Sequence, residues 1–395
     1  MSAEVISKWL NRSLYAKINQ IHLKPIEHKL LKGKPISCQK GQAEVFFLVD
    51  NNGNWWILKK FHNTCALDHA YLEKISSLLP QEEGFRCGME RQVLVKGSLD
   101  SSQKYYHNLE FNQWLDGTIL MPRIKGIDWS ALSDEIREGN IHLDKMQRLT
   151  LCKNLTLLVK SLEQNQCCHR DFSCGNVFID TDTWLVSLID FDSLYHPSLQ
   201  MPRGTTCGTT GYTPPYAWHN GKLDPTGTWQ AYADRYALAL LVAEFLLVDQ
   251  GSDATGEGGI FDQDELKNRS GSGLNLIISQ LRPQYPQAAR FLEETIRSSD
   301  FTQCPSPQDW MNFYNTIPSL LVTPPSLNEL ADIPADYFVK LLAKRRPAAP
   351  LWPAPRLGEM PMPDISLPKP QSPGLPASLV ALPPDPWAKQ NQLAV

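Results

Sequence analysis

The sequence predicts an α+β protein in which a small β-rich unit comes first, a mainly α-helical unit follows, and a proline-rich tail ends the chain. Residues 44–61 contain two β-rich runs around Asn51–Asn54, a turn of the kind that closes hairpins. After Trp129 the apolar residues recur with helical spacing. Residues 347–395 are so rich in proline that they cannot build a packed core, so we expect a disordered or polyproline II tail.

The β-rich unit is predicted to contain one main helix. Glu44–Asp50 and Trp55–Phe61 are the two strands of the hairpin. Ala66–Leu79 follows, with apolar residues at helical spacing up to a proline that ends the pattern. Arg91–Gly97 and Thr118–Ile124 are predicted as further strands.

Two long helices dominate the second unit. Met146–Leu162 is apolar on one face, and Asp234–Val248 is almost continuously apolar, as expected of a buried central helix. Between them, Val177–Ile179 and Leu185–Ile189 predict short strands.

Two segments of the second unit are rich in loop-forming residues. Arg203–Pro215 is rich in Gly, Thr and Pro, and Gly251–Gly273 in Gly, Ser and Asp. We expect the first to be a loop and the second to be a surface insertion between helices. Binding and catalytic residues are concentrated on loops, so the first segment is the more informative.

Bulk composition is that of an ordinary globular protein and leaves open local patches of charge. The 395 residues are 42% hydrophobic and 20% charged, which is ordinary for a globular protein with a sizeable core. The net charge of −4 gives no indication of a nucleic-acid or anionic-membrane partner, and no apolar run approaches the roughly 18 residues that span a bilayer. Nine cysteines without CxxC pairs favour reduced thiols, and Met1–Gln20 lacks the features of a signal or transit peptide. The expected location is therefore cytoplasmic.

The most informative run is His169–Asn176, H-R-D-F-S-C-G-N, followed by I-D-F-D at Ile189–Asp192. Phosphoryl transfer needs one carboxylate to orient and deprotonate the attacking hydroxyl, and a second carboxylate with an amide oxygen to hold Mg²⁺. Asp171, Asp190 and Asn176 supply that set. The spacing resembles the catalytic and metal-binding loops of the protein-kinase-like superfamily, and in particular a divergent bacterial group of serine/threonine protein kinases.

The resemblance covers roughly residues 30 to 320 and implies a bilobal fold with a small β-rich N-lobe and a mainly α C-lobe. The expected organisation is an N-terminal extension, the two lobes, a helical extension and the proline-rich tail, with boundaries at 1–29, 30–125, 126–320, 321–346 and 347–395.

The resemblance also implies how a nucleotide is held. Lys59 on the second hairpin strand is similar to the lysine that contacts ATP phosphates, with Glu73 on the following helix as its ion-pair partner and Glu82 and Glu83 as rivals. Strand alternation puts Lys60 on the opposite face, where a surface charge is expected. The residues expected to contact ATP are Gly41, Ala43, Val45, Lys59, Met121, Ile124 and Asp190.

Several positions depart from the family pattern. Gly41 is the one glycine left in the stretch that matches the glycine-rich loop, and Ser173 stands where a catalytic lysine is usual. Asp192 replaces the glycine of D-F-G, either as a third metal ligand beside Asn176 and Asp190 or as a turn former. Met121 is expected near the gatekeeper position, and plain core packing is an alternative that does not exclude this role. The metal is expected to be Mg²⁺, with Mn²⁺ as the alternative.

The segment Gly208–Pro215, G-T-T-G-Y-T-P-P, resembles the end of a kinase activation segment and favours protein substrates. Asp234 resembles the buried helix-start aspartate that ties down the catalytic loop. Tyr216 and Cys304 occupy the positions of a buried Glu–Arg pair, so both charges are missing together, which can be near neutral for stability. Regulation by an activation-loop phosphate would use Arg170, and the candidate phosphosites are Thr205, Thr206, Thr209 and Thr210.

The function expected from these motifs is ATP-dependent phosphoryl transfer to Ser or Thr hydroxyls of proteins, with Asp171 as catalytic base. One alternative is a pseudokinase scaffold, because the glycine loop is degenerate. Another is a small-molecule kinase of the aminoglycoside phosphotransferase type, which shares the loop motifs. The proline-rich tail is expected either to bind an aromatic-groove module of a partner protein or to be a flexible extension.

Overall fold

The structure is a computed structural model that describes residues 2–11, 15–40, 42–62, 68–100, 109–202, 208–253 and 259–317. These residues belong to one compact unit, Met1–Phe338. Gly41, Thr205, Thr206 and the predicted regions 321–346 and 347–395 lie outside the described residues. No helix of the described part is long and apolar enough to cross a bilayer.

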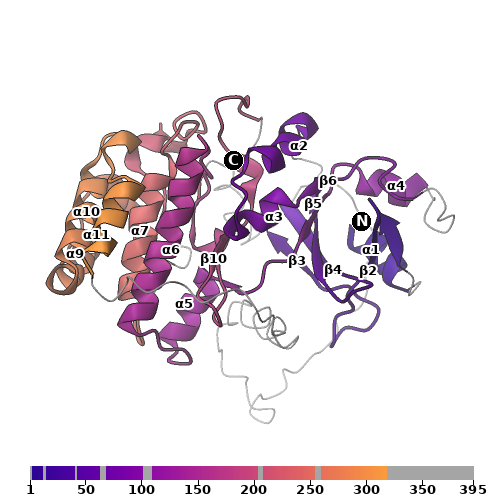
Figure 1. Ribbon diagram of the computed structural model, residues 1–395, viewed down its shortest axis with the longest axis horizontal. Coiled ribbons are helices and arrows are strands. Elements are labelled where there is room, and N and C mark those ends of the chain that lie inside the picture. The colour runs from indigo at the N-terminus through magenta and orange to yellow at the C-terminus, as the bar shows by residue number, and fades with distance from the viewer. Residues whose placement is uncertain are drawn as a thin grey trace, which may run out of the picture. The chain divides into compact units, whose positions relative to one another are not determined.

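The described chain is a mixed α+β structure whose N-terminal part contains a seven-stranded sheet (Figure 1). Its strands follow the order β1-β2-β4-β5-β7-β6, and β3 also pairs with β4. Every strand pair of this sheet is antiparallel. The strands are β1 (Ala16–Ile18), β2 (Ile21–Pro25), β3 (Ser37–Lys40), β4 (Ala43–Asp50), β5 (Trp55–Phe61), β6 (Gln92–Val93) and β7 (Ile119–Pro122).

The predicted hairpin is confirmed as β4 and β5, and the turn chemistry explains it. The Asp50 carboxylate accepts hydrogen bonds from the backbone amides of Asn52 and Asn54 at 2.9 and 2.8 Å. Gly53 adopts a φ of +88°, a conformation that glycine reaches without strain. The side chain of Asp50 therefore satisfies the amides that the tight turn leaves unpaired.

Helices pack around this sheet, and of the five helical elements described here the sequence predicted one, α2. They are α1 (Ser2–Asn11), α2 (His69–Leu78), η1 (Glu83–Phe85), α3 (Arg86–Met89) and α4 (Leu109–Leu115). The predicted helix is confirmed as α2, which begins after Asp68, whose carboxylate accepts from the Tyr71 amide at 3.0 Å. The strand predicted over Arg91–Gly97 is reduced to β6. Because β2 pairs with β4, the sheet also starts before residue 30, inside the segment expected to be an extension.

The two faces of the sheet serve different cores. One face contributes Phe46, Leu48, Leu58 and Leu120 to an apolar cluster with α1 and α4. The other face carries Lys59, which lies directly opposite Val45 and Ile119 on the neighbouring strands. The sheet thus buries one face under two helices, while the other face contributes Ala43, Phe61 and Ile119 to the larger apolar core and also carries Lys59.

The remaining described residues are mainly helical. The long helices α6 and α7 pack side by side, and α9, α10 and α11 gather beside them (Figure 1). The helices are α5 (Trp129–Arg137), α6 (Lys145–Gln164), α7 (Asp234–Leu247), α8 (Gln263–Asn268), α9 (Ser272–Gln284), α10 (Pro286–Arg297) and α11 (Pro307–Asn315). Short 3₁₀ turns are η3 (Cys174–Asn176), η4 (Phe191–Ser193), η5 (Pro215–Ala217) and η6 (Phe301–Gln303).

Small sheets complete this part of the chain. The strands are β8 (Ile127–Asp128), β9 (Val177–Ile179), β10 (Val186–Leu188), β11 (Trp218–His219) and β12 (Lys222–Leu223). The first three form the sheet β10-β9-β8, and β11 pairs with β12. Gly126 leads into β8 with a φ of +103°, and a Cβ there would lie 2.3 Å from the Ile179 carbonyl oxygen. A glycine is therefore required where β8 approaches β9.

The expectation that Gly251–Gly273 is a plain insertion is wrong in part, because α8 lies within it. The Asp262 carboxylate accepts hydrogen bonds from the amides of Asp264 and Glu265, both at 2.9 Å, and so caps the helix. Leu266 is fully buried and anchors it. The cap and one buried leucine outweigh a composition that favours loops.

The positions of the missing charged pair meet as expected. The Tyr216 hydroxyl lies 3.7 Å from the Cys304 sulfur and 3.4 Å from the Ser298 hydroxyl. Cys304 and Ser298 are buried. Neutral groups therefore fill a buried site where the family resemblance implies an ion pair.

Candidate active site

Asp171 lies between α6 and β9, on a loop that Asn176 closes. The Asn176 amide nitrogen donates to the backbone carbonyl of Asp171 at 2.7 Å and to its carboxylate Oδ2 at 3.2 Å. The other carboxylate oxygen, Oδ1, accepts a hydrogen bond from the Thr209 hydroxyl at 2.8 Å. Asp171 is half-buried, and its carboxylate is oriented by one amide while it holds one hydroxyl.

Asp234 holds the backbone just before Asp171 in place. Its carboxylate accepts hydrogen bonds from the backbone amides of His169 at 2.6 Å and Arg170 at 2.8 Å. The side chain sits at the start of α7 and is only 2% exposed. The predicted structural role of Asp234 is thereby confirmed.

Lys59 joins the sheet to the loop after β10. Its ammonium group donates to Asp190 Oδ1 at 2.7 Å and to Asp192 Oδ2 at 2.6 Å. Arg91 donates to the other oxygen of Asp192, Oδ1, at 2.7 Å. We call these four residues, Lys59, Arg91, Asp190 and Asp192, the Lys59 cluster.

The charges of the Lys59 cluster shift one another's pKa values. Burial lowers the pKa of Lys59, but the adjacent Asp190 and Asp192 carboxylates outweigh it and hold that pKa above its ordinary value. Burial and the neighbouring Asp192 raise the pKa of Asp190, against the effect of Lys59. Burial also acts to raise the pKa of Asp192, but Lys59 and Arg91 outweigh it and hold that pKa well below its ordinary range. Asp192 is therefore the strongly ionised carboxylate of the cluster.

The predicted Lys59–Glu73 ion pair is not the pairing that the structure describes. Glu73 lies on the exposed face of α2, and the carboxylates bound to Lys59 come from the loop after β10. Of the rivals, Glu82 accepts from the Ser161 hydroxyl and Glu83 pairs with Arg86. The two carboxylates of I-D-F-D can replace a glutamate on the helix because both lie within reach of one ammonium group.

Asp192 forms contacts that the sequence did not predict. Both of its oxygens bind cationic side chains, so in this structure it is the counter-ion of Lys59 and Arg91. Asp190 is the more accessible carboxylate, with a side chain 36% exposed against 15% for Asp192. Its backbone lies in the left-handed region, with a φ of 66°, which aspartate tolerates better than most residues.

Arg91 is a site residue that sequence reasoning missed. It stands just before β6 and is 7% exposed. An arginine at the edge of a predicted strand looks like a solvated charge, and nothing in the local pattern indicates a partner 101 residues away. Only the folded arrangement of β6 against the loop after β10 reveals it.

The predicted nucleotide contacts in the described sheet share one face. Ala43 lies opposite Phe61, Val45 opposite Lys59, and Met121 opposite Ile57. Opposite residues, and alternate residues along a strand, point to the same side of a sheet, so Ala43, Val45 and Met121 lie on the face of Lys59. Ile124, just after β7, is buried in the larger apolar core.

Lys60 lies on the other face, as predicted. Its ammonium group donates to the Asp116 carbonyl at 2.8 Å and lies 5.7 Å from the centre of the Trp114 ring. Lys59 and Lys60 thus have separate partners on opposite sides of β5, and only Lys59 approaches Asp190.

Arg170 is held differently from the predicted phosphate-binding role. Its guanidinium group donates to the carbonyls of Ser193, Pro225 and Thr228 at 3.0, 2.9 and 3.0 Å, and to the Thr228 hydroxyl at 3.0 Å. It also lies 4.7 Å from the centre of the Trp229 ring, and the residue is 4% exposed. These bonds occupy donors that a phosphate would need, so Arg170 links the loop of Asp171 to the segment before α7.

The candidate phosphosites differ in their surroundings. Thr209 donates its hydroxyl to Asp171, whereas Thr210 is exposed. Thr205 and Thr206 lie outside the described residues. The described part of this segment therefore brings one threonine to the Asp171 carboxylate.

Glu244 is a second residue that sequence reasoning missed. It lies on α7, is 1% exposed, and accepts hydrogen bonds from Trp129 Nε1 at 2.9 Å, the Tyr212 hydroxyl at 3.0 Å and the Ile260 amide at 3.2 Å. Burial raises the pKa of Glu244 to about 7. A single carboxylate in the apolar interior of a helix indicates a buried polar site, so the sequence pattern could have identified Glu244.

Gln263 on α8 also anchors the Gly208–Pro215 segment. Its carbonyl oxygen accepts from the Gly211 amide at 2.6 Å, and its amide nitrogen donates to the Thr213 carbonyl at 3.4 Å. Together with Tyr212 on Glu244, these contacts fix the backbone that follows Thr209. The segment is thus positioned from α7 and α8.

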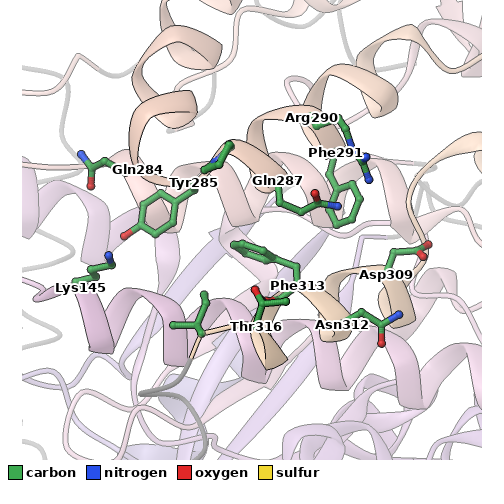
Figure 2. A pocket seen from close by; sticks show the side chains of 12 residues that line it. Lys145, Gln284, Tyr285, Gln287, Arg290, Phe291, Asp309, Asn312, Phe313 and Thr316 are labelled. Atoms are coloured by element: carbon green, nitrogen blue, oxygen red, sulfur yellow. The ribbon is translucent and has the colours of Figure 1, made fainter.

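A separate hollow of about 540 Å³ lies among α6, α10 and α11 (Figure 2). Tyr285, Phe291 and Phe313 form part of its lining, and Lys145 lies at one side with its ammonium group 5.5 Å from the Tyr285 ring centre. None of the predicted site residues lines it. It is therefore distinct from the Asp171 and Lys59 region.

Among the described residues, no three side chains of His, Cys, Asp or Glu lie together as a metal-binding group. No protein-family model matches the chain, and a search of curated proteins finds no significant relative.

Proposed function

We propose that this protein is a serine/threonine protein kinase that transfers phosphate from ATP to protein hydroxyls, on a bilobal protein-kinase-like fold. The observation that carries the proposal is the contact between Lys59 and Asp190, 131 residues apart in the chain. Two motifs that were assigned to phosphate and metal binding from the sequence alone meet at this point. The same resemblance assigned Asp171 and Asn176, which contact each other on the neighbouring loop.

Asp171 is the proposed catalytic base. Its Oδ1 holds the Thr209 hydroxyl at 2.8 Å, within the distance at which a base accepts a proton from a reacting hydroxyl. Asn176 holds the carboxylate in place through Oδ2. A substrate serine or threonine that takes the position of the Thr209 hydroxyl would donate its proton to the same oxygen.

Lys59 is the proposed phosphate ligand. Its ammonium group stays charged because Asp190 and Asp192 hold its pKa above the ordinary value, and a charged lysine is what a polyphosphate requires. Ala43, Val45 and Met121 share its face of the sheet and would line the nucleotide base.

The oxygen donors fit a hard divalent cation. Asp190 is partly exposed and Asn176 is half-buried, and carboxylate and amide oxygens are ligands that Mg²⁺ and Mn²⁺ prefer. Asn176 and Asp190 would hold the ion, which when bound would neutralise phosphate charge. Asp192 is engaged by two cations and would not join them.

Protein substrates are supported by the Gly208–Pro215 segment. Glu244 and Gln263 hold it in a defined path next to Asp171. A fixed backbone beside the base is suited to align an extended peptide, because alignment of the reacting hydroxyl is a large part of catalysis.

The test is intact-mass spectrometry of phosphatase-treated protein incubated with ATP and Mg²⁺ or Mn²⁺. Phosphate should be added to the wild-type chain, or to a generic protein substrate mixed with it. Asp171→Asn and Lys59→Ala should add none, and Lys60→Ala is the matched control that keeps activity. If the wild type phosphorylates no protein under any of these conditions, the proposal fails, and phosphate on an added aminoglycoside would instead assign a small-molecule kinase.

A further inference from the structure

The turn between β2 and β3 places two leucines in water. Leu30 is 74% exposed and Leu31 is 57% exposed, and neither belongs to an apolar core. Among the described residues, they are the only large exposed hydrophobic residues that are adjacent in sequence. Single exposed leucines are ordinary, so it is the adjacency of the two at one turn that sets this site apart.

The backbone holds this pair in place. The His28 ring nitrogen Nδ1 accepts hydrogen bonds from the amides of Leu30 and Leu31 at 3.2 and 3.1 Å. His28 also donates its own amide to the Lys34 carbonyl at 2.8 Å, and Gly33 donates its amide to the Glu27 carboxylate at 2.6 Å. The exposure of the two leucines therefore belongs to a defined turn, which we call the 28–34 loop.

The charged side chains among residues 29–34 are all lysines. Lys29, Lys32 and Lys34 are all exposed, and none of them forms an ion pair with another described residue. The one nearby carboxylate in the sequence, Glu27, is bound to the Gly33 amide. The net charge of −4 for the whole chain conceals this local cationic site.

We propose that the 28–34 loop is a docking surface for an anionic lipid bilayer. Leu30 and Leu31 enter the boundary between headgroups and acyl chains, and the three lysines contact anionic headgroups, the combination that binds peripheral proteins to membranes. A projecting apolar tip between cations suits a soft, uniformly charged interface. A protein partner would need a hollow of matching shape.

The test is flotation of the full-length chain with vesicles of phosphatidylcholine alone or mixed with phosphatidylserine. The chain should float with the mixed vesicles, and much less with the neutral ones or at high salt. The double variant Leu30→Ser with Leu31→Ser should bind at least about tenfold more weakly. The triple variant Lys29→Gln, Lys32→Gln and Lys34→Gln should lose about fivefold for each lysine.

Matched controls separate this loop from the rest of the surface. Leu276, on α9, is also 57% exposed, and Lys222 is exposed on β12, so Leu276→Ser and Lys222→Gln should bind like the wild type. Melting temperatures equal to that of the wild type show that the loop variants fold. Absence of flotation with mixed vesicles would overturn the proposal. So would flotation that the loop variants leave unchanged, which would point to the basic sequence Lys344-Arg345-Arg346.

Discussion

The Lys59 cluster and the contact between Tyr216 and Cys304 are both largely buried polar sites, but they differ in charge. The first joins two cations and two carboxylates by three ion pairs at 2.6 to 2.7 Å. The second joins a phenol, a thiol and the Ser298 hydroxyl at 3.4 to 3.7 Å. Both stand where the family resemblance implies one buried ion pair.

The difference separates a site that retains buried ions from one in which neutral groups replace both ions. Burying ions costs more than burying neutral groups, and a paired loss of both ions is often neutral for stability. At Tyr216 and Cys304, neutral side chains stand in place of both ions. At Lys59 the chain keeps the charge and supplies new partners, which is expected if the ammonium group itself is needed.

Asp192→Asn is the substitution expected to have the largest effect on stability. It leaves Lys59 and Arg91 without the carboxylate that both contact, and a broken buried pair costs about 3 kcal/mol of unfolding free energy. Urea denaturation at neutral pH measures this loss. An unfolding free energy equal to that of the wild type would show that the cluster is not stabilising.

The stability difference between wild type and Asp192→Asn should also change with pH in a definite direction. The pKa of Asp192 is held below its ordinary range, so its contribution to stability is present above about pH 4 and is lost as the pH falls through the lower, folded-state pKa. The difference between wild type and Asp192→Asn should therefore shrink in acid. A difference that grows in acid would contradict the assigned direction.

Glu244→Gln is expected to change the pH dependence next most strongly. Burial raises the pKa of Glu244 from 4.5 to about 7, so its favourable contribution is full below the ordinary value and is lost as the pH rises through 7. Between pH 4.5 and pH 7, the titration of Glu244 should lower the free energy of unfolding of the wild type by about 3 kcal/mol. The variant does not titrate there, so its stability relative to wild type should rise with pH, and a difference independent of pH would refute the prediction.

Tyr216→Phe is expected to have the smallest effect. It removes one hydroxyl from long, neutral contacts, so the loss should be about 1 kcal/mol or less. Tyr236→Phe is the matched control, because the buried Tyr236 hydroxyl has no hydrogen-bond partner among the described residues. A loss at Tyr216 as large as that of Asp192→Asn would remove the contrast between the two sites.

Local rules account for the parts that the sequence predicted. The hairpin at Asp50, the separation of Lys59 from Lys60, and the long helices follow from turn chemistry and from the periods of strand and helix. Asp234 was found through its place at the start of an apolar helix. Each of these depends on neighbours within a few residues or on a fixed motif spacing.

The parts that were missed depend on long-range geometry. Arg91 meets Asp192 across 101 residues, and Arg170 finds its carbonyl partners 23 to 58 residues away. Glu73 was assigned to Lys59 from helix placement, and the choice of partner is instead decided by where the I-D-F-D loop runs. No periodic pattern in the sequence encodes these distances.

The most direct test of the central claim is the rate of phosphoryl transfer by Glu73→Gln beside that of Asp192→Asn. If loop carboxylates hold Lys59, Glu73→Gln should keep the wild-type rate within about twofold, and Asp192→Asn should fall at least about tenfold. Melting temperatures well above the assay temperature would show that both variants remain folded during the assay. A large loss in Glu73→Gln with Asp192→Asn unchanged would contradict the account and place Glu73 beside Lys59 in the working enzyme.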